Sequence, residues 1–365
     1  MAEVVITGQD SKTLAAVGEF GLIEALAAWL PPGRRTLVGI GDDAAVLAVP
    51  DGRVVATTDF LLEGRHFRLD WASAADVGHK AAARSLADLA AMGAEPSALL
   101  VALAAPADLA LDWARELAAG LADECARAGA GVIGGDTARA DAVLLAVTGL
   151  GDLAGRAPVR RSGAAPGDLV AVAGPLGPAA AGLALLAAGI SDDPLVAPLI
   201  AGHLRPAPPY DAGPEAADLG ATAMIDVSDG LLADLGHVAA ASGVRIDLDS
   251  AALRPGEDLL TAARAVAEQD RHGSGRTGRV ARPGDPGALR WVLTGGEDHS
   301  LAATFPPGTP LPPRWRVIGT VRQGNGVVVD GQPWAGAPGW DHFAELAPGG
   351  SAPGDPRIGG LPAPL

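Results

Sequence analysis

Aspartate-containing motifs recur through this chain, most of them where a strand-like apolar segment meets glycine or a hydroxyl residue. Six such motifs are spread over both halves of the sequence: GIGDDAAVL, ATTDFLLEGRHF, RSLADLAAMGAEP, VIGGDTAR, MIDVSDGLLADL and LTGGEDHS. Around them, apolar residues alternate between the two-residue period of strands and the longer period of helices. The pattern predicts an α/β (α+β) fold that presents carboxylates at the ends of its elements.

The length of 365 residues predicts two domains. The expected division is an N-terminal extension (1–17), an N-terminal domain (18–155), a C-terminal α/β domain (156–346) with a poorly ordered insertion at about 270–286, and a Pro/Gly-rich tail (347–365) without a packed core. The expected helices span about 20–30, 74–92, 109–128, 179–188 and 231–241. The expected strands span 36–40, 45–49, 54–58, 98–103, 131–133, 143–150, 169–173, 291–293, 301–305 and 317–321, with one near 246.

The composition argues against several classes of protein. A net charge of −16 disfavours a nucleic-acid partner, because such partners require clustered Lys and Arg. The lone Cys125 lies in an apolar helical pattern, which predicts a buried thiol and excludes a disulfide framework. The N-terminal sequence has no export signal, so a cytoplasmic location is expected. The uncharged stretch Leu169–Ile190 contains Gly174 and Pro175, and it predicts a strand, a turn and a helix, with no membrane span.

The two lysines of the chain, Lys12 and Lys80, exclude a Walker-type phosphate loop, because neither follows a glycine-rich turn or precedes Ser or Thr. Phosphoryl transfer can instead depend on magnesium ions held by dispersed carboxylates. Aspartates at turns and strand ends are the residues that this chemistry needs. The sequence therefore predicts carboxylate-held magnesium.

In the first half, Asp43 follows Asp42 after a glycine turn, although an aspartate-rich turn without metal would have the same sequence. The segment 54–58 reads as a strand that ends at Thr57, Thr58 and Asp59, where two hydroxyls and a carboxylate suit a hard cation. Seven residues further on, His66 is either a phosphate or ring contact or an ordinary surface histidine.

Two further motifs of the first half carry an aspartate. Asp88 interrupts an apolar helix, so it is either paired, bound to metal or turned to solvent. In VIGGDTAR a strand leads into Gly134, Gly135 and Asp136, where the missing side chains would allow a phosphate to approach the backbone.

The second half repeats this chemistry. Asp226, Ser228 and Asp229 lie at a predicted strand-to-helix junction, where the helix N-terminus favours an anion, although Asp229 could simply cap the helix. Glu297 and Asp298 follow two glycines in LTGGEDHS.

Together the motifs GIGDDAAVL, TTDFLLEGRHF, SLADLAAMGA, IGGDT, RSGAAPGD, IDVSDGL and GGED resemble the thiamine-monophosphate kinase family over residues 18–343. That family is similar to aminoimidazole ribonucleotide synthetase, selenophosphate synthetase and a hydrogenase-maturation dehydratase. The resemblance implies a two-domain subunit and a homodimer formed through the sheet of the N-terminal domain. It also implies ATP-dependent phosphorylation of thiamine monophosphate to thiamine diphosphate, by direct in-line transfer with several Mg²⁺ ions.

The resemblance further implies a role for each motif residue. The implied magnesium ligands are Asp43, Thr57, Thr58, Asp59, Asp88, Asp136, Asp226 and Asp229; the ATP contacts are Gly135, Asp136, Arg161 and Ser228; the substrate contacts are His66, Glu297 and Trp340. The ring of Trp340 suits a cationic heterocycle, although a core tryptophan would look the same. The pair Arg160 and Arg161 leaves open which arginine contacts ATP.

Two alternative functions would require other sequence features. A selenophosphate synthetase or the dehydratase would need a reactive cysteine near one end of the chain, and Cys125 fits neither. A non-catalytic nucleotide or metal sensor would be expected to have a broken carboxylate set, whereas the set here is intact.

Overall fold

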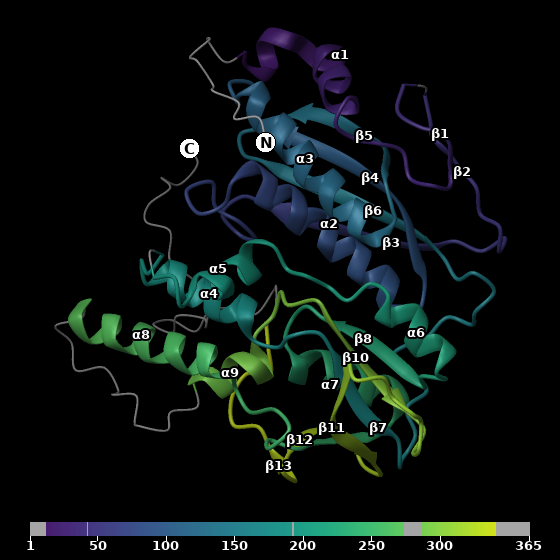
Figure 1. Cartoon of the computed structure of the whole chain (residues 1–365), viewed down its shortest axis with the longest axis vertical. Coiled ribbons are helices and arrows are strands. Elements are labelled where there is room, and N and C mark those ends of the chain that lie inside the picture. Colours follow the sequence, from purple (N-terminus) through teal and green to yellow (C-terminus); the bar gives the residue numbers. More distant parts are fainter. Residues whose placement is uncertain (1–11, 42, 192, 274–286, 341–365) are drawn as a thin grey trace, which may run out of the picture. The chain divides into compact units, whose positions relative to one another are not determined.

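A computed structural model describes residues 12–41, 43–191, 193–273 and 287–340. The predictions for Asp42, for most of the N-terminal extension, for insertion residues 274–286 and for the tail fall outside these residues. Contacts divide the chain into two compact units, Met1–Ser85 with Pro96–Gly151 and Leu86–Glu95 with Asp152–Leu365. The units combine helices and sheets, which confirms the mixed fold class (Figure 1).

The first unit is built on a four-stranded sheet in the order β3-β6-β4-β5. β3 and β6 are antiparallel and β4 and β5 are parallel. Its elements are α1 (Leu14–Ala27), β1 (Thr36–Val38), β2 (Val46–Leu47), β3 (Val55–Leu62), α2 (Ala74–Ala91), β4 (Glu95–Ala105), α3 (Leu111–Ala128), β5 (Val132–Arg139) and β6 (Leu144–Asp152), although the end of α2 and Glu95 belong to the second unit.

Two glycines allow α2 and α3 to pack backbone to backbone. A Cβ atom at Gly78 would lie 2.2 Å from the Leu117 carbonyl oxygen, and one at Gly120 would lie 2.1 Å from the Ala75 carbonyl oxygen. Any side chain would therefore separate the helices. Cys125 is buried in α3 as predicted, and burial raises the pKa of its thiol to about 12.

The second unit contains a seven-stranded sheet in the order β13-β12-β9-β11-β7-β10-β8, in which only the β12/β9 pair is parallel. One face carries an apolar core between the sheet and helices that include α4, α7 and α9. Its elements after residue 152 are β7 (Leu169–Ala173), α4 (Pro178–Ala187), α5 (Ala197–Leu204), α6 (Ala212–Asp218), β8 (Ala223–Val227), α7 (Leu231–Ser242), β9 (Arg245–Leu248), α8 (Glu257–Gly273), α9 (Gly287–Thr294), β10 (Ser300–Phe305), β11 (Trp315–Arg322), β12 (Gly326–Val329) and β13 (Gln332–Pro333).

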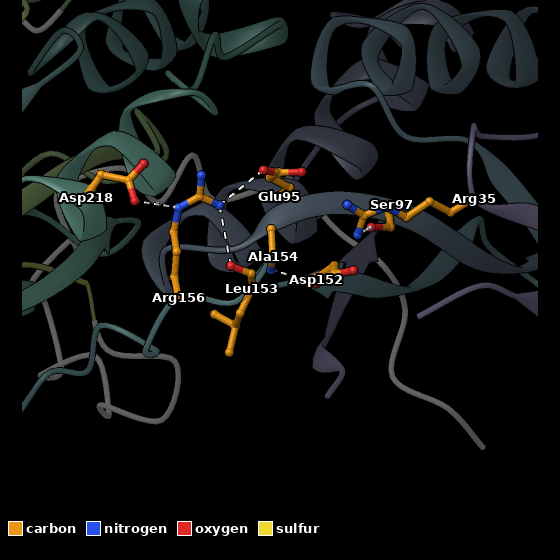
Figure 2. Close-up of polar contacts among 8 residues, drawn as sticks. All are labelled: Arg35, Glu95, Ser97, Asp152, Leu153, Ala154, Arg156 and Asp218. Carbon is orange, nitrogen blue, oxygen red and sulfur yellow. Dashed lines mark hydrogen bonds and ion pairs between the residues drawn. The ribbon is translucent and has the colours of Figure 1, made fainter. Parts of the chain in front are cut away.

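The end of α2 joins the second unit through close contact with α6. A Cβ atom at Gly213 would lie 2.0 Å from the Ala90 carbonyl oxygen. Nearby, Arg156 pairs with Asp218 at 2.8 Å and with Glu95 at 3.1 Å (Figure 2). Because of these contacts, residues 86–95 pack as part of the second unit. The sequence pattern does not indicate this.

Most predicted elements occur, with three corrections. Residues 291–293 lie in helix α9, because Ala288 and Val292 are buried one turn apart and the short apolar run fits either element type. β3 and β5 continue through the predicted strand ends at residues 57–59 and 134–136, because both segments remain paired to neighbouring strands.

The stretch Leu169–Ile190 forms β7, a turn and α4 as predicted, and no described helix is long and apolar enough to span a membrane.

Candidate active site

The three predicted ligands of β3 do not point to one place. Strand alternation puts Thr57 and Asp59 on one face and the exposed Thr58 on the other. On the α2 side, the Asp59 carboxylate accepts a 2.8 Å hydrogen bond from Ser85 Oγ and lies 3.9 Å from the Arg84 guanidinium. The side chains of Thr57 and Asp59 can share a ligand, whereas that of Thr58 cannot join them.

The predicted residues of β5 lie on the opposite edge of the same sheet. The exposed Asp136 carboxylate accepts a 2.8 Å hydrogen bond from the Thr137 N–H. A Cβ atom at Gly135 would lie 1.8 Å from the Val101 carbonyl oxygen, so the pairing of β5 with β4 requires a glycine here. Since β3 and β5 are separated by two strands, Asp59 and Asp136 stand about 14 Å apart across the sheet.

The two remaining candidates of the first unit lie in connecting segments. Asp43 is exposed in the turn between β1 and β2. His66 Nδ1 accepts a 3.0 Å hydrogen bond from the Leu62 N–H. Because a backbone N–H can only donate, this bond requires a lone pair on Nδ1 and places the proton of the neutral ring on Nε2. His66 is thereby oriented to donate a hydrogen bond from Nε2.

In the second unit, three chain segments meet at the N-terminal end of α7. The Glu297 N–H donates to the Ser228 carbonyl oxygen at 2.8 Å, and the Trp340 N–H donates to the Asp229 carbonyl oxygen at 2.8 Å. A Cβ atom at Gly296 would lie 2.3 Å from the Ser228 carbonyl oxygen, so the GGED loop can approach only as glycine. The structure thus brings together the segments of Ser228, Asp229, Glu297 and Trp340, which the resemblance assigns to ATP, magnesium and the substrate.

Carboxylates accumulate at the same place. The buried Asp234 accepts hydrogen bonds from the N–H groups of Asp229 and Gly230 at 3.1 and 3.0 Å, while Asp226 lies 3.1 Å from His299 Nδ1. Burial raises the pKa of Asp234 to about 8, and the charges of Asp226 and Asp229 contribute. A divalent cation bound nearby would relieve this repulsion, because its charge favours the ionised form of the carboxylates. Sequence reasoning missed Asp234, although a carboxylate inside the apolar pattern of α7 was a usable signal.

Arg161 is not brought to this cluster. Its carbonyl oxygen accepts a 3.2 Å hydrogen bond from Ser242 Oγ at the last residue of α7, whereas Ser228 precedes the first turn. The 12 residues of α7 put the two backbone positions about 18 Å apart. The Arg160 carbonyl oxygen accepts from the Met224 N–H at the start of β8, so both arginines are attached at that end of the unit.

Asp88 is partly buried on α2, among wholly buried neighbours such as Leu86 and Leu89. It is therefore neither a solvent-facing residue nor a fully buried one. Across the described residues, no group of three or more His, Cys, Asp and Glu side chains is arranged to hold a metal ion.

The sequence matches the models of the AIR synthase related protein N-terminal domain over residues 41–153 and C-terminal domain over residues 165–277. It is 47% identical to the thiamine-monophosphate kinase of Mycobacterium tuberculosis over 92% of this chain and 95% of that protein.

Among solved structures, the thiamine-monophosphate kinase of Stenotrophomonas maltophilia matches with a TM-score of 0.70 and 33% identity, over 85% of this chain and 95% of that one. The structure of AaThiL complexed with AMPPCP and TMP matches with a TM-score of 0.70 and 32% identity, over 92% of this chain and the whole of that one. The identity to these relatives extends over both units and nearly their full length. The chain therefore belongs to the thiamine-monophosphate kinase family.

Proposed function

We propose that this enzyme uses ATP to phosphorylate thiamine monophosphate, forming thiamine diphosphate. The observation that carries the proposal is that the segments of Ser228, Glu297 and Trp340 meet at the N-terminal end of α7. There the Ser228 carbonyl oxygen accepts from the Glu297 N–H, and the Asp229 carbonyl oxygen accepts from the Trp340 N–H. A related kinase of known structure holds AMPPCP and TMP together, which supports both substrates.

Three side chains suit the acceptor. The indole face of Trp340 attracts a cationic ring, and the Glu297 carboxylate complements its charge. His66, whose Nδ1 accepts from the Leu62 N–H, can donate from Nε2 to a phosphate oxygen. A hydrogen-bond donor at this position suits the binding of a phosphate group better than the abstraction of a proton.

The proposed reaction is one direct displacement. A phosphate oxygen of thiamine monophosphate forms a bond to the γ-phosphorus of ATP, the bond from that phosphorus to the bridging oxygen breaks, and ADP leaves. Cys125 is excluded as a covalent nucleophile because it is buried and its pKa is raised to about 12.

Magnesium would be held by the carboxylates that the sequence predicts. In the second unit Asp226 and Asp229 are the candidates, with Asp234 beside them; in the first unit Asp59 is the most enclosed one. When bound, magnesium neutralises phosphate charge and aligns the reacting groups. The role of the chain is to orient these carboxylates, and a bound cation would favour the ionised form of Asp234, whose pKa burial raises to about 8.

We also propose that the enzyme is a homodimer formed through the sheet of the first unit. On β3 the outward face carries Ala56, Thr58 and Phe60, and the Phe60 side chain is 56% exposed. A second copy would cover this surface. Sedimentation of Phe60→Glu should then show a monomer at micromolar concentration, whereas Val317→Glu, at an exposed apolar position of the second unit (42%), should stay dimeric. A monomeric and fully active wild-type protein would refute the dimer.

The function is tested by incubating the purified full chain with ATP, Mg²⁺ and thiamine monophosphate and measuring thiamine diphosphate and ADP. Equal amounts of both products are expected, with none after chelation of the metal. Binding of ATP and Mg²⁺ without product would favour the non-catalytic sensor instead.

A further inference from the structure

We propose that Asp298 is a positioning residue that fixes Glu297 in the active site. Asp298 follows Glu297 in the GGED loop, and its side chain is buried, with 3% of the residue exposed. This inference rests on the proposed function, because it assigns Glu297 to the acceptor substrate.

The Asp298 carboxylate joins the GGED loop to the start of α4. Its Oδ2 accepts from the Gly177 N–H at 2.6 Å and its Oδ1 accepts from the Ala179 N–H at 2.9 Å. Pro178 between them has no N–H, so the carboxylate satisfies the N–H groups on both sides of the proline. Two residues further on, Ser300 donates from Oγ to the Pro175 carbonyl oxygen in the same β7–α4 connection.

On its other side the loop is bound to the end of β8. The N–H of Glu297 donates to the Ser228 carbonyl oxygen, and the N–H of His299 donates to the Val227 carbonyl oxygen at 2.9 Å. The side chains of 298 and 300 thus bind one connection, while the backbone N–H groups of 297 and 299 bind another. The loop is held from both sides.

The loop has a backbone that its residues do not favour. Glu297 and His299 have φ angles of 68° and 51°, in the left-handed region that non-glycine residues avoid. Such a conformation persists only where the surroundings impose it, and it is concentrated at functional sites. Asp298, between the two, supplies the side-chain anchor. We infer that without this anchor the Glu297 carboxylate would no longer be directed to the acceptor.

The substitution Asp298→Asn tests this inference, because it preserves volume but replaces one acceptor oxygen with an N–H₂ group that faces a donor. We expect kcat/KM for thiamine monophosphate to fall by about tenfold or more, with KM for ATP little changed. In a Glu297→Ala background the same substitution should have an effect below about threefold, because the group it positions is gone.

The matched control is Asp168→Asn. Asp168 is also buried and accepts from a backbone N–H, that of Ala165, but it precedes β7 at the opposite end of the strand from the α4 connection. It should lower stability without a selective effect on the acceptor. An undiminished effect of Asp298→Asn in the Glu297→Ala background, or equal changes in KM for both substrates, would overturn the positioning role.

A second measurement does not depend on activity. Amide hydrogen exchange of the full-length Asp298→Asn protein should accelerate within 177–179 and 296–300 and remain unchanged in β8 and α7. Absence of thiamine diphosphate synthesis by wild type would refute the proposed function, and the exchange pattern would still decide the positioning role. Unchanged exchange in these segments, or acceleration throughout the second unit, would contradict it.

Discussion

In the first unit Thr57, Thr58, Asp59 and Asp136 lie inside paired strands, whereas in the second unit Ser228, Asp229 and Glu297 lie in connections between strands and helices. Thr57, Thr58 and Asp59 are consecutive on β3 and therefore point to alternate faces. Ser228 and Glu297 are 69 positions apart in sequence, and their backbones are joined by a 2.8 Å hydrogen bond.

The difference shows that a motif in a strand and a motif in a loop carry different information. In a strand, neighbours in sequence are separated by the pleat, and only alternate residues can act together. In a loop, glycine allows a second segment to approach, as Gly296 does at Ser228. Substitutions that separate these two situations test the comparison.

The largest effect is expected at β3, from Asp59→Asn at limiting magnesium. Loss of a magnesium ligand removes several kcal/mol of charge stabilisation, so turnover should fall by at least about a hundredfold. Asn can retain the hydrogen bond from Ser85 Oγ, so folding should be preserved. Steady-state turnover as a function of magnesium concentration is the measurement.

The matched control for β3 is Thr58→Val, which changes the opposite face of the strand. It should stay within about threefold of wild type, since its side chain cannot share a cation with Asp59. Equal losses in both variants would mean that alternation does not separate their roles.

The next effect concerns the loops of the second unit. In Gly296→Ala the new methyl group would meet the Ser228 carbonyl oxygen at 2.3 Å and displace the GGED loop. A displacement near 1 Å should reduce kcat/KM by about a hundredfold. Gly236→Ala within α7 is the control, because no atom lies within 4 Å of its added Cβ, and it should preserve activity and slightly raise Tm. A fully active Gly296→Ala enzyme would show that the close approach is dispensable.

The sequence predicted much of this arrangement, and the failures have physical causes. The junction at Asp226, Ser228 and Asp229 was predicted because an apolar strand, a polar turn and an amphipathic helix follow one another in sequence. The continuation of β3 through Asp59 was not, because hydroxyls and a carboxylate resemble a strand end when the pairing partner β6 is unknown. The close packing of Gly135 against the backbone of β4 was not predicted either, because it depends on the pairing of β5 with β4.

A smaller effect is expected at Trp340, whose backbone is held against the Asp229 turn. For Trp340→Ala we expect KM for thiamine monophosphate to rise about tenfold, equivalent to ~1.4 kcal/mol of stacking, with KM for ATP little changed. Trp334→Ala is the control, because Trp334 packs against the apolar core of the second unit and should affect stability alone. Equal rises in the KM values for thiamine monophosphate and ATP would indicate that Trp340, like Trp334, is a core residue.

The smallest effect expected is on stability as a function of pH, and it separates the buried Asp298 from the partly exposed Asp59 of the first unit. Burial raises the pKa of Asp298 from 3.8 to about 7, against the opposing influence of the Ala179 and Gly177 N–H groups and of His299. The folded state then holds this proton more tightly than the unfolded state does. Its contribution is fully present below about pH 4 and is lost as pH rises through about 7.

The substitution Asp298→Asn removes this titration, so the decline in Tm between pH 5 and 8 should be shallower in the variant than in wild type. One kcal/mol corresponds to roughly 2–4 °C in a unit of this size, which calorimetry resolves easily. Asp59→Asn is the control, since its site lies in the other unit, and it should leave that pH slope unchanged. Equal slopes of Tm against pH in Asp298→Asn and wild type would mean that the Asp298 carboxylate stays ionised over this range. Its two N–H donors would then outweigh the effect of burial on its pKa.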